Sequence, residues 1–298
     1  MKPFLKWAGG KTQLLPILDE KIPRENIENT IYIEPFVGAG AFFLYLAHNY
    51  NFKKYIICDI NHKLINVYNQ IKSNLEVLLT ILDDIAERYN SYETMEEKDT
   101  YYYELRNEFN DNPTEERETA LFIFINKACF NGIYRENASG GYNVPFGKRK
   151  TVSPYSREQI QDISNMLNLR DLEGNYKVEI YTGDFNYIVD LISPNEKYFI
   201  YMDPPYRPVT VGGFSSYHSS PFNDEKQIEL AKFIREKLTQ GNINWLLSNS
   251  DPHNLDENDN FFDELYEGFH IQRINASRRV NSNGNGRGNI TELLIKNY

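Results

Sequence analysis

The sequence has very little cysteine and no long apolar segment. Cys58 and Cys129 are its two cysteines in 298 residues, which argues against a disulfide framework and favours a reducing compartment. No apolar run approaches the roughly 20 residues that span a bilayer. The N-terminal stretch MKPFLKWAGGKTQLL also lacks the continuous apolar core of a secretory signal peptide. We therefore expect a cytoplasmic protein with no membrane segment, and the 41% of hydrophobic residues is enough for one large domain or two moderate ones.

Positive charge is also scarce, but it is unevenly placed. The formal net charge is −10, and the acidic excess is concentrated in residues 83–118. Residues 120–160 and 273–288 instead carry an excess of Lys and Arg. A phosphate backbone responds to the local field rather than to the net charge, so a nucleic-acid partner stays open provided that residues 83–118 face away from it. The alternative is ordinary solvated surface charge.

Strand patterns occur at both ends of the chain, and helical patterns occupy the middle. Between the first two strand patterns, GAFFLYLAHN has helical spacing, which makes a strand–helix–strand unit typical of a parallel sheet. Helical periodicity then dominates residues 61–130, and Gly, Asn and Pro predict loops over 131–155. The sequence thus predicts an α/β fold with a Rossmann-like sheet, formed by residues 1–60 and 177–298 and interrupted by a helical domain at 61–176. The predicted strands are residues 30–36, 54–60, 177–185, 197–203, 242–249, 270–277 and 290–297.

A glycine-containing turn indicates a nucleoside cofactor. In EPFVGAG (34–40), Gly38 and Gly40 follow a strand and open a helix, where a ligand can approach the backbone and unpaired N–H groups. Asp59 ends the next strand, where a carboxylate usually holds two ribose hydroxyls. Phe43 stands where the dinucleotide fingerprint requires a third glycine, so that fingerprint is broken. The alternative is a glycine turn needed only for packing.

Two shorter motifs are weak by themselves. KWAGGK (6–11) places two lysines and a Trp around a Gly-Gly pair, and in isolation it reads as a solvated turn. TGDF (182–185) puts Asp184 and Phe185 at a strand end, where they suit hydrogen bonding to an adenine ring and covering of that ring.

The stretch YFIYMDPPY (198–206) ends an apolar strand with an acid, two prolines and an aromatic residue. Strand ends of an open α/β sheet face the ligand crevice, so Asp203 to Tyr206 should line it. The prolines fix the turn and donate no N–H, which leaves carbonyls to accept. If Asp203 and the Pro204 carbonyl each accept one N–H of an aromatic amino group, the lone pair of that nitrogen is aimed at a methyl electrophile. Tyr206 would stack on the base. The alternative is a surface Pro-Pro turn.

Taken in order, these motifs resemble the Dam-type DNA adenine-N6 methyltransferases (D12 class, group alpha). The resemblance covers nearly the whole chain and is least at about 70–115. That family includes solitary Dam enzymes and partners of GATC-cutting restriction endonucleases. The segments that carry the resemblance are FLKWAGGK, IEPFVGAGAFF, CDIN, FNGIYREN, YNVPFGK, GDF and YMDPPY.

The resemblance implies methyl transfer from S-adenosylmethionine to N6 of an adenine flipped out of duplex DNA, within GATC. It implies a methyltransferase sheet that is mostly parallel with an antiparallel C-terminal hairpin. The helical domain would be the target-recognition domain, with a recognition hairpin at about 130–150. A restriction endonuclease acting on the same site, without a stable complex, is an expected partner. No residue is assigned to a metal.

The resemblance also assigns individual residues. Lys11 would meet the carboxylate of the donor and Asp59 its ribose. Asn131 would clamp a phosphate, and Phe130, where relatives often have Tyr, would wedge into the space left by the flipped base. The cofactor-binding set is Trp7, Lys11, Glu34, Pro35, Phe36, Gly38, Gly40, Asp59, Asp184, Phe185 and Asp203; the catalytic set is Asp203, Pro204, Pro205 and Tyr206; the DNA-binding set is Lys6, Phe130, Asn131, Ile133, Arg135, Asn143, Pro145 and Lys148.

Within the DNA-binding set, Lys6 and Arg135 match guanine-reading residues, and Pro145 matches a residue near a cytosine. FSSYHSSPF (214–222) and RRVNSNGNGRG (278–288) resemble DNA-side loops of the family, with plain flexible loops as the alternative. Three rival functions stay open. They are an RNA or cytosine amino-group methyltransferase of the same fold, a DNA-binding module without activity, and a nicotinamide-dependent oxidoreductase, which the broken glycine fingerprint disfavours.

Overall fold

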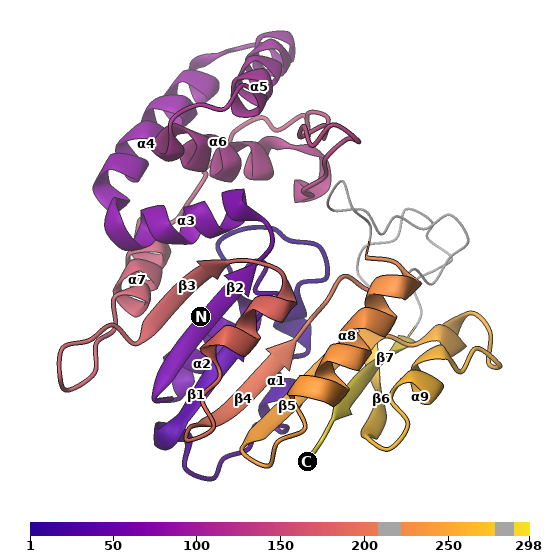
Figure 1. The fold of residues 1–298 in the computed structure, drawn as a ribbon. Coiled ribbons are helices and arrows are strands. Elements are labelled where there is room, and N and C mark those ends of the chain that lie inside the picture. The colour runs from indigo at the N-terminus through magenta and orange to yellow at the C-terminus, as the bar shows by residue number, and fades with distance from the viewer. Residues whose placement is uncertain (208–221, 278–288) are drawn as a thin grey trace.

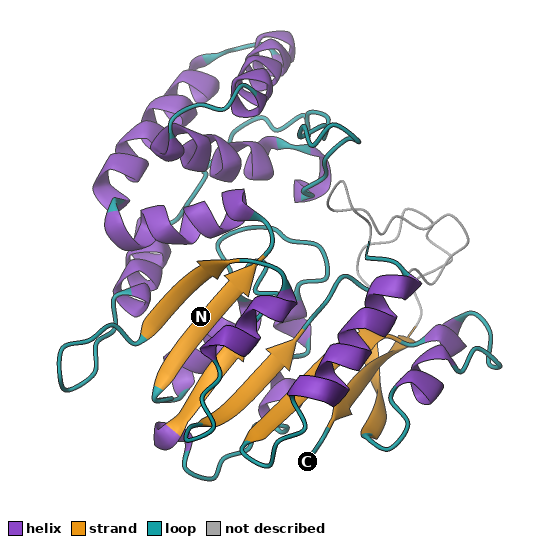
Figure 2. Ribbon diagram, viewed as in Figure 1, coloured by secondary structure: helices purple, strands orange, loops and turns teal. Residues whose placement is uncertain are grey.

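The structure is a computed structural model that describes residues 1–207, 222–277 and 289–298. Within these residues a seven-stranded sheet forms the centre of the molecule (Figure 2). In spatial order its strands are β3 (Val178–Thr182), β2 (Lys54–Asp59), β1 (Thr30–Glu34), β4 (Lys197–Met202), β5 (Ile243–Ser250), β7 (Asn289–Lys296) and β6 (His270–Ser277). The first five are parallel to their neighbours, and β7 is antiparallel to both β5 and β6. The predicted strands and the predicted sheet are confirmed.

The strands separate two apolar cores, because successive side chains of a strand point to opposite faces. On β1, Tyr32 joins one core and Ile33 the other, and both are fully buried. The Tyr32 side of the sheet packs on α1 (Leu15–Asp19), α2 (Ala41–Asn49) and α3 (His62–Ser73). The Ile33 side packs on η4 (Phe185–Leu191), α8 (Asp224–Lys237) and α9 (Phe261–Leu265). Phe43, which replaces the third glycine of a dinucleotide site, lies fully buried in the first core.

The helical middle of the chain stands beyond one edge of the sheet (Figure 1). It contains α4 (Leu75–Ser91), α5 (Met95–Asn110) and α6 (Glu115–Ala128), and α3 links these helices to β2 and β3. The helical run predicted from residue 61 breaks at Asn74, whose φ of −134° ends α3 and precedes α4. Two helices, α7 (Arg157–Leu167) and α8, were not predicted from the sequence. The division into domains at residues 61 and 176 stays a proposal.

Local sequence explains the helix starts. Thr94 and Glu97 form a reciprocal capping box at the start of α5, and the Asn61 side chain accepts the Leu64 N–H at the start of α3. Acidic residues fill the first turn of α6, where they favour the positive end of the helix dipole. Among the described residues, no helix combines the length and the apolar character needed to cross a membrane.

Candidate active site

The carboxyl ends of β1, β2 and β4 lie at the same edge of the sheet. These strands are parallel, with Glu34 opposite Ile57 and Ile33 opposite Ile200. The chain continues from β1 to α2 on one face and from β4 to α8 on the other, so the connections diverge between these two strands. Ligands of open α/β sheets bind at such a point. The 34–40 turn, Asp59 and the 203–206 turn meet there.

The glycine turn has no room for side chains. Gly38 (φ +50°) and Gly40 (φ +70°) both adopt the left-handed conformation. A Cβ on Gly38 would lie 2.9 Å from the Trp7 indole, and a Cβ on Gly40 would lie 2.7 Å from the Tyr68 hydroxyl. That hydroxyl donates to the Gly38 carbonyl at 2.9 Å. Trp7 therefore lies directly against the turn, as expected for a residue of the same cofactor site.

Asp59 ties the end of β2 to this turn. Its Oδ2 accepts the Gly38 N–H at 3.0 Å, and its Oδ1 accepts the Asn61 N–H at 2.9 Å. The two backbone donors fix the orientation of the carboxylate. Glu34 is only 3% exposed and accepts the Tyr32 hydroxyl at 2.6 Å. Burial raises the pKa of Glu34 well above its usual range, and the neighbouring Pro35 is also buried.

Near the end of β3, the predicted cofactor-binding residues are only partly exposed to a ligand. Phe36 is half-buried, and its ring centroid lies 5.8 Å from that of Phe185. Phe185 is 1% exposed and packs against Phe233 in the second core. This placement does not support the expectation that the Phe185 ring covers an adenine. Asp184 is half-buried, and its side chain accepts the Phe185 N–H at 2.7 Å, so it caps η4.

Asp203 and Lys11 form the centre of the site. Lys11 Nζ lies 2.8 Å from Asp203 Oδ1, donates to the Gly9 carbonyl and lies 4.5 Å from the Tyr206 ring centroid. Burial raises the pKa of Asp203, and the Lys11 charge opposes that shift. Lys11 is 5% exposed, so it does not belong to a solvated turn, although Lys6, Gly9 and Gly10 of the same motif are exposed.

The Asp-Pro-Pro-Tyr turn is anchored from α8 and β5. Gln227 donates to the Pro205 carbonyl at 3.0 Å, and Asn249 holds that amide in place by donating to it at 3.1 Å. Asn249 also accepts the Arg207 N–H at 3.3 Å. Among the described residues, the Pro204 carbonyl accepts no hydrogen bond, as the hypothesis of amino-group binding requires.

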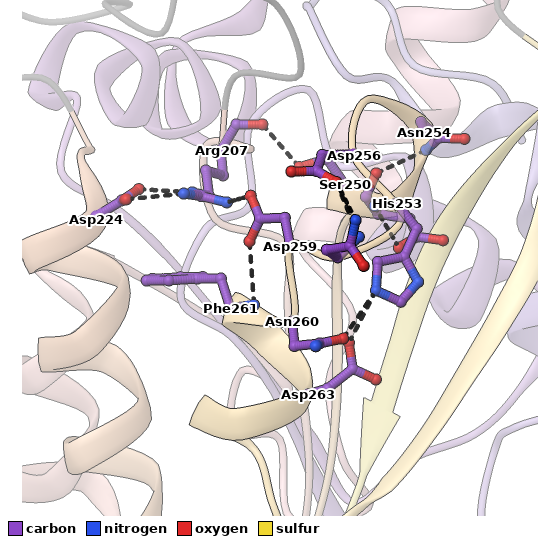
Figure 3. A network of polar contacts seen from close by, with 12 residues as sticks. Arg207, Asp224, Ser250, His253, Asn254, Asp256, Asp259, Asn260, Phe261 and Asp263 are labelled. Carbon is purple, nitrogen blue, oxygen red and sulfur yellow. Dashed lines mark hydrogen bonds and ion pairs between the residues drawn. The ribbon is translucent and has the colours of Figure 1, made fainter.

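The chain that leaves the turn is held equally firmly. The Tyr206 hydroxyl donates to Glu292 of β7 at 2.8 Å. Arg207 forms ion pairs with Asp224 at 2.8 Å and with Asp259 at 2.6 Å (Figure 3). The Ser250 hydroxyl donates to the Arg207 carbonyl at 2.7 Å. These contacts hold Tyr206 and Arg207 in place at the end of the turn.

The anchoring residues Gln227, Asn249, Ser250 and Glu292 were not predicted from the sequence. A signal was present, because Ser248-Asn249-Ser250 is a polar run at the carboxyl end of an apolar strand. That end shares its sheet edge with Asp203, which follows β4. Among the described residues, no group of three or more His, Cys, Asp or Glu side chains could hold a metal ion. Residues 278–288 and all of 214–222 except Phe222 lie outside the described part of the chain.

Comparison with known proteins decides the family. Residues 7–280 match the family described as D12 class N6 adenine-specific DNA methyltransferase. The chain belongs to this family. It is 41% identical to the type II methyltransferase M.MjaIII of Methanocaldococcus jannaschii, over 100% of this chain and 99% of that protein. It is 34% identical to the type II methyltransferase M1.LlaDCHI of Lactococcus lactis subsp. cremoris, over 100% and 96%. It is 31% identical to the DNA adenine methylase of Escherichia coli K12, over 98% and 94%.

The resemblance seen in the sequence is therefore confirmed, and the oxidoreductase alternative is wrong. Membership of a DNA methyltransferase family implies a DNA substrate and a methyl donor. The roles of individual residues remain predictions.

In this methyltransferase, Lys6 packs against the 130–132 turn, which begins the predicted recognition hairpin. The Asn126 side chain accepts the Lys6 N–H at 3.0 Å and donates to the carbonyls of Lys6 and Gly132. A Cβ on Gly132 would lie 2.3 Å from the Lys6 side chain. The N-terminal segment and the 130–132 turn are thus one local structure.

The other predicted DNA contacts gather on the same hairpin of the methyltransferase. Phe130 is 53% exposed, although its backbone is fixed by an N–H bond to the Pro145 carbonyl. The half-buried Arg135 donates through Nε to the Asn143 side chain at 2.6 Å. The remaining members are Asn131, which is exposed with a φ of +56°, the half-buried Ile133, and the exposed Pro145 and Lys148.

An aromatic stack joins the two predicted sites. The Trp7 ring stacks on Tyr134 with centroids 5.5 Å apart, and Tyr134 stacks on Phe122 at 5.2 Å. Tyr134 stands between the predicted DNA contacts Ile133 and Arg135 in the sequence. In the methyltransferase, the Trp7 indole therefore contacts both the candidate cofactor turn and Tyr134 of the candidate recognition hairpin.

Proposed function

We propose that the protein transfers a methyl group from S-adenosylmethionine to N6 of an adenine that is flipped out of duplex DNA. The observation that carries this proposal is the Asp203 carboxylate, held through Oδ1 and followed by the Pro204 carbonyl, which accepts no hydrogen bond from the described residues. Two acceptors at a rigid turn suit an amino group, because they orient both of its N–H bonds. Orientation of this kind lowers barriers by several kcal/mol, on the order of 7 to 11 at best.

The residues of the crevice fit the proposed donor. The Asp59 carboxylate, oriented by two backbone N–H groups, would hold ribose hydroxyls beside the Gly38 turn, which the Trp7 indole packs against. Lys11 would hold the donor's carboxylate, and Trp7 would lie beside it. When bound, S-adenosylmethionine supplies an electrophilic methyl carbon on a sulfonium. The chain itself has to hold the amino nitrogen in line and to exclude water.

The hairpin residues fit duplex DNA. An adenine in a duplex is paired and stacked, so it must be extruded at a cost of a few kcal/mol. The exposed Phe130 ring would fill the space left by the base, and Tyr206 would stack on the extruded ring. Lys6 and Arg135 would read guanines of GATC in the major groove, while Asn131 and Lys148 would contact phosphates.

A second candidate is methylation of an amino group in RNA or on cytosine. The pair formed by Asp203 and the Pro204 carbonyl recognises an aromatic amino group and does not by itself choose the base. We also propose a restriction endonuclease that acts on the same site without a stable complex. Two of the relatives are named type II methyltransferases, which supports this partner.

Nucleoside analysis tests the proposal. The protein is incubated with methyl-labelled S-adenosylmethionine and a duplex containing GATC, a matched duplex with the outer G·C pair exchanged, or an RNA of the same sequence. Label on adenine N6 in the GATC duplex alone is expected. Label in RNA or on cytosine would favour the second candidate, and no label in any substrate would contradict both.

A further inference from the structure

Ser248 connects the catalytic turn to the interior of the sheet. It lies near the end of β5 and is completely buried. Its hydroxyl lies 2.9 Å from Asp203 Oδ1 and 2.9 Å from the hydroxyl of Tyr201, which is itself 1% exposed. Within the described residues, no other hydrogen bond joins the Asp203 carboxylate to β5.

The order of donors along these three groups is determined by their chemistry. An ionised carboxylate only accepts hydrogen bonds, and a hydroxyl has one proton to donate. Ser248 must therefore donate to Asp203, and Tyr201 must donate to Ser248.

Both nearest contacts of the Asp203 carboxylate fall on the same oxygen. Lys11 Nζ lies 2.8 Å from Oδ1, and the Ser248 hydroxyl donates to Oδ1 as well. Within the described part of the chain, no hydrogen bond reaches Oδ2. The Asp203 side chain is 20% exposed, whereas that of Lys11 is 6% exposed. The buried contacts thus hold one carboxylate oxygen and leave the other for a ligand.

We propose that Ser248 is a positioning residue for methyl transfer: by holding Oδ1, it turns Oδ2 of Asp203 toward the amino group of the target base. This inference rests on the proposed function of Asp203. It adds a residue and names the carboxylate oxygen that accepts from the substrate. Ser248 itself does not touch the substrate.

The same contact affects the ionisation of Asp203. Burial raises the pKa of Asp203, and both Lys11 and the Ser248 hydrogen bond lower it. The other titratable groups that face this carboxyl are Tyr32 and Glu34 from β1, Tyr201 from β4 and Tyr206 from the turn. Removal of the Ser248 hydroxyl should therefore raise the pKa of Asp203, because the ionised form loses a donor.

The test measures single-turnover methyl transfer to duplex DNA against pH for the wild type and Ser248→Ala. The rate at neutral pH is expected to fall about tenfold, because the variant loses one hydrogen bond to a charged group. The acid limb of the profile should move upward by roughly one pH unit. The KM values for DNA and donor should change less than about twofold, since neither ligand touches Ser248.

Ser250→Ala is the matched control. Ser250 lies two residues further on the same strand and is 2% exposed, but its hydroxyl donates to the Arg207 carbonyl instead of Asp203. It should lower stability without moving the acid limb. Ser248→Thr keeps a hydroxyl and should restore the position of the limb. An unmoved limb in Ser248→Ala, with a loss equal to that of Ser250→Ala, would overturn the proposal.

Tyr201→Phe and an NMR titration test the role of Ser248 by independent routes. If Ser248→Ala does not fold, Tyr201→Phe removes the preceding donor and should shift the limb in the same direction by less; no shift would overturn the inference. A carbon-13 NMR titration of the Asp203 carboxyl, assigned with Asp203→Asn, reports its pKa without turnover. If the wild type methylates no substrate, the proposed function fails, while this titration still shows whether Ser248 controls the carboxyl.

Discussion

Lys11 and Asp203 form an ion pair of 2.8 Å between an N-terminal loop and the end of β4. Lys11 belongs to the residues predicted to hold the cofactor, and Asp203 to those predicted to hold the target amino group. The Lys11 ammonium also lies 4.5 Å from the Tyr206 ring centroid. One buried cation therefore borders the donor side and the base side of the proposed reaction.

Replacing Asp203 by Ala should abolish most methyl transfer and leave much of the DNA binding. The loss of a preorganised group acting on the reacting atoms costs on the order of 100-fold or more in rate. Single-turnover rates and the fluorescence anisotropy of a labelled duplex measure the two effects separately. Asp203→Asn, which keeps the side-chain volume, controls for packing. Near-normal turnover in both variants would remove Asp203 from the mechanism.

Glu34→Gln should change the pH dependence of stability. The pKa of Glu34 is raised by burial, so the folded state holds its proton to higher pH than the unfolded state. Wild-type stability therefore falls as pH rises from the ordinary glutamate pKa through the raised pKa, by at most about 1.4 kcal/mol per pH unit. The Gln variant lacks this loss. Urea unfolding across the acid range should show that the free energy of unfolding of Glu34→Gln, compared with that of the wild type, rises with pH.

Glu97→Gln provides a control of opposite sign. Glu97 is exposed in the capping box of α5, and hydrogen bonds from Thr94 lower its pKa. Wild-type Glu97 contributes its stability above the ordinary glutamate pKa and loses it as pH falls through the lowered pKa. The Gln variant should thus lose relative stability as pH rises. The same trend in both variants would contradict the assignment for Glu34.

The sequence predicted the strands well, because apolar β-branched runs and the turns between them are local signals, whereas the antiparallel C-terminal part of the sheet was expected from the family resemblance. It also located the Gly38 turn, Asp59 and the Asp203 turn, since each follows a strand directly. It did not identify Gln227 as a supporting residue, because its partner Pro205 is distant in the sequence, and the polar run that contains Ser248 was its one local signal for that residue. Phe185 shows that a local pattern can also suggest a role that the packing does not support. An aromatic residue after an acid suits a base-stacking role, yet only the packing of η4 determines that its ring enters the core.

Gly38→Ala should weaken cofactor binding. The new Cβ would lie 2.9 Å from the Trp7 indole, and the φ of +50° would cost an alanine about 1 to 2 kcal/mol. Isothermal titration with S-adenosylmethionine should show at least about a tenfold loss of affinity, which corresponds to 1.4 kcal/mol. Gly174→Ala carries backbone strain at a φ of +86° but has open space around its Cβ. Gly174→Ala should lose stability but keep its affinity for S-adenosylmethionine. Equal affinities of the two variants for this donor would argue against the Gly38 site.

Arg135→Ala should relax sequence choice at a single base pair. If the guanidinium reads a guanine, its loss costs about 1 to 3 kcal/mol of discrimination at that position. Methylation rates on duplexes that carry each single substitution in GATC give this value. Lys148→Ala is the comparison, because a phosphate contact weakens all sequences equally and lowers the salt dependence by about one unit of slope. Uniform loss in Arg135→Ala would reassign Arg135 to the phosphate backbone.

The central claim is that Asp203 and the Pro204 carbonyl together hold the amino group of an extruded adenine. A crystal structure of the protein with a GATC duplex and a non-reactive analogue of the donor tests it most directly. We predict that Asp203 Oδ2 and the Pro204 oxygen each lie within about 3.2 Å of the adenine N6. An adenine that remains stacked in the duplex, or an extruded adenine whose N6 is remote from Asp203, would contradict it.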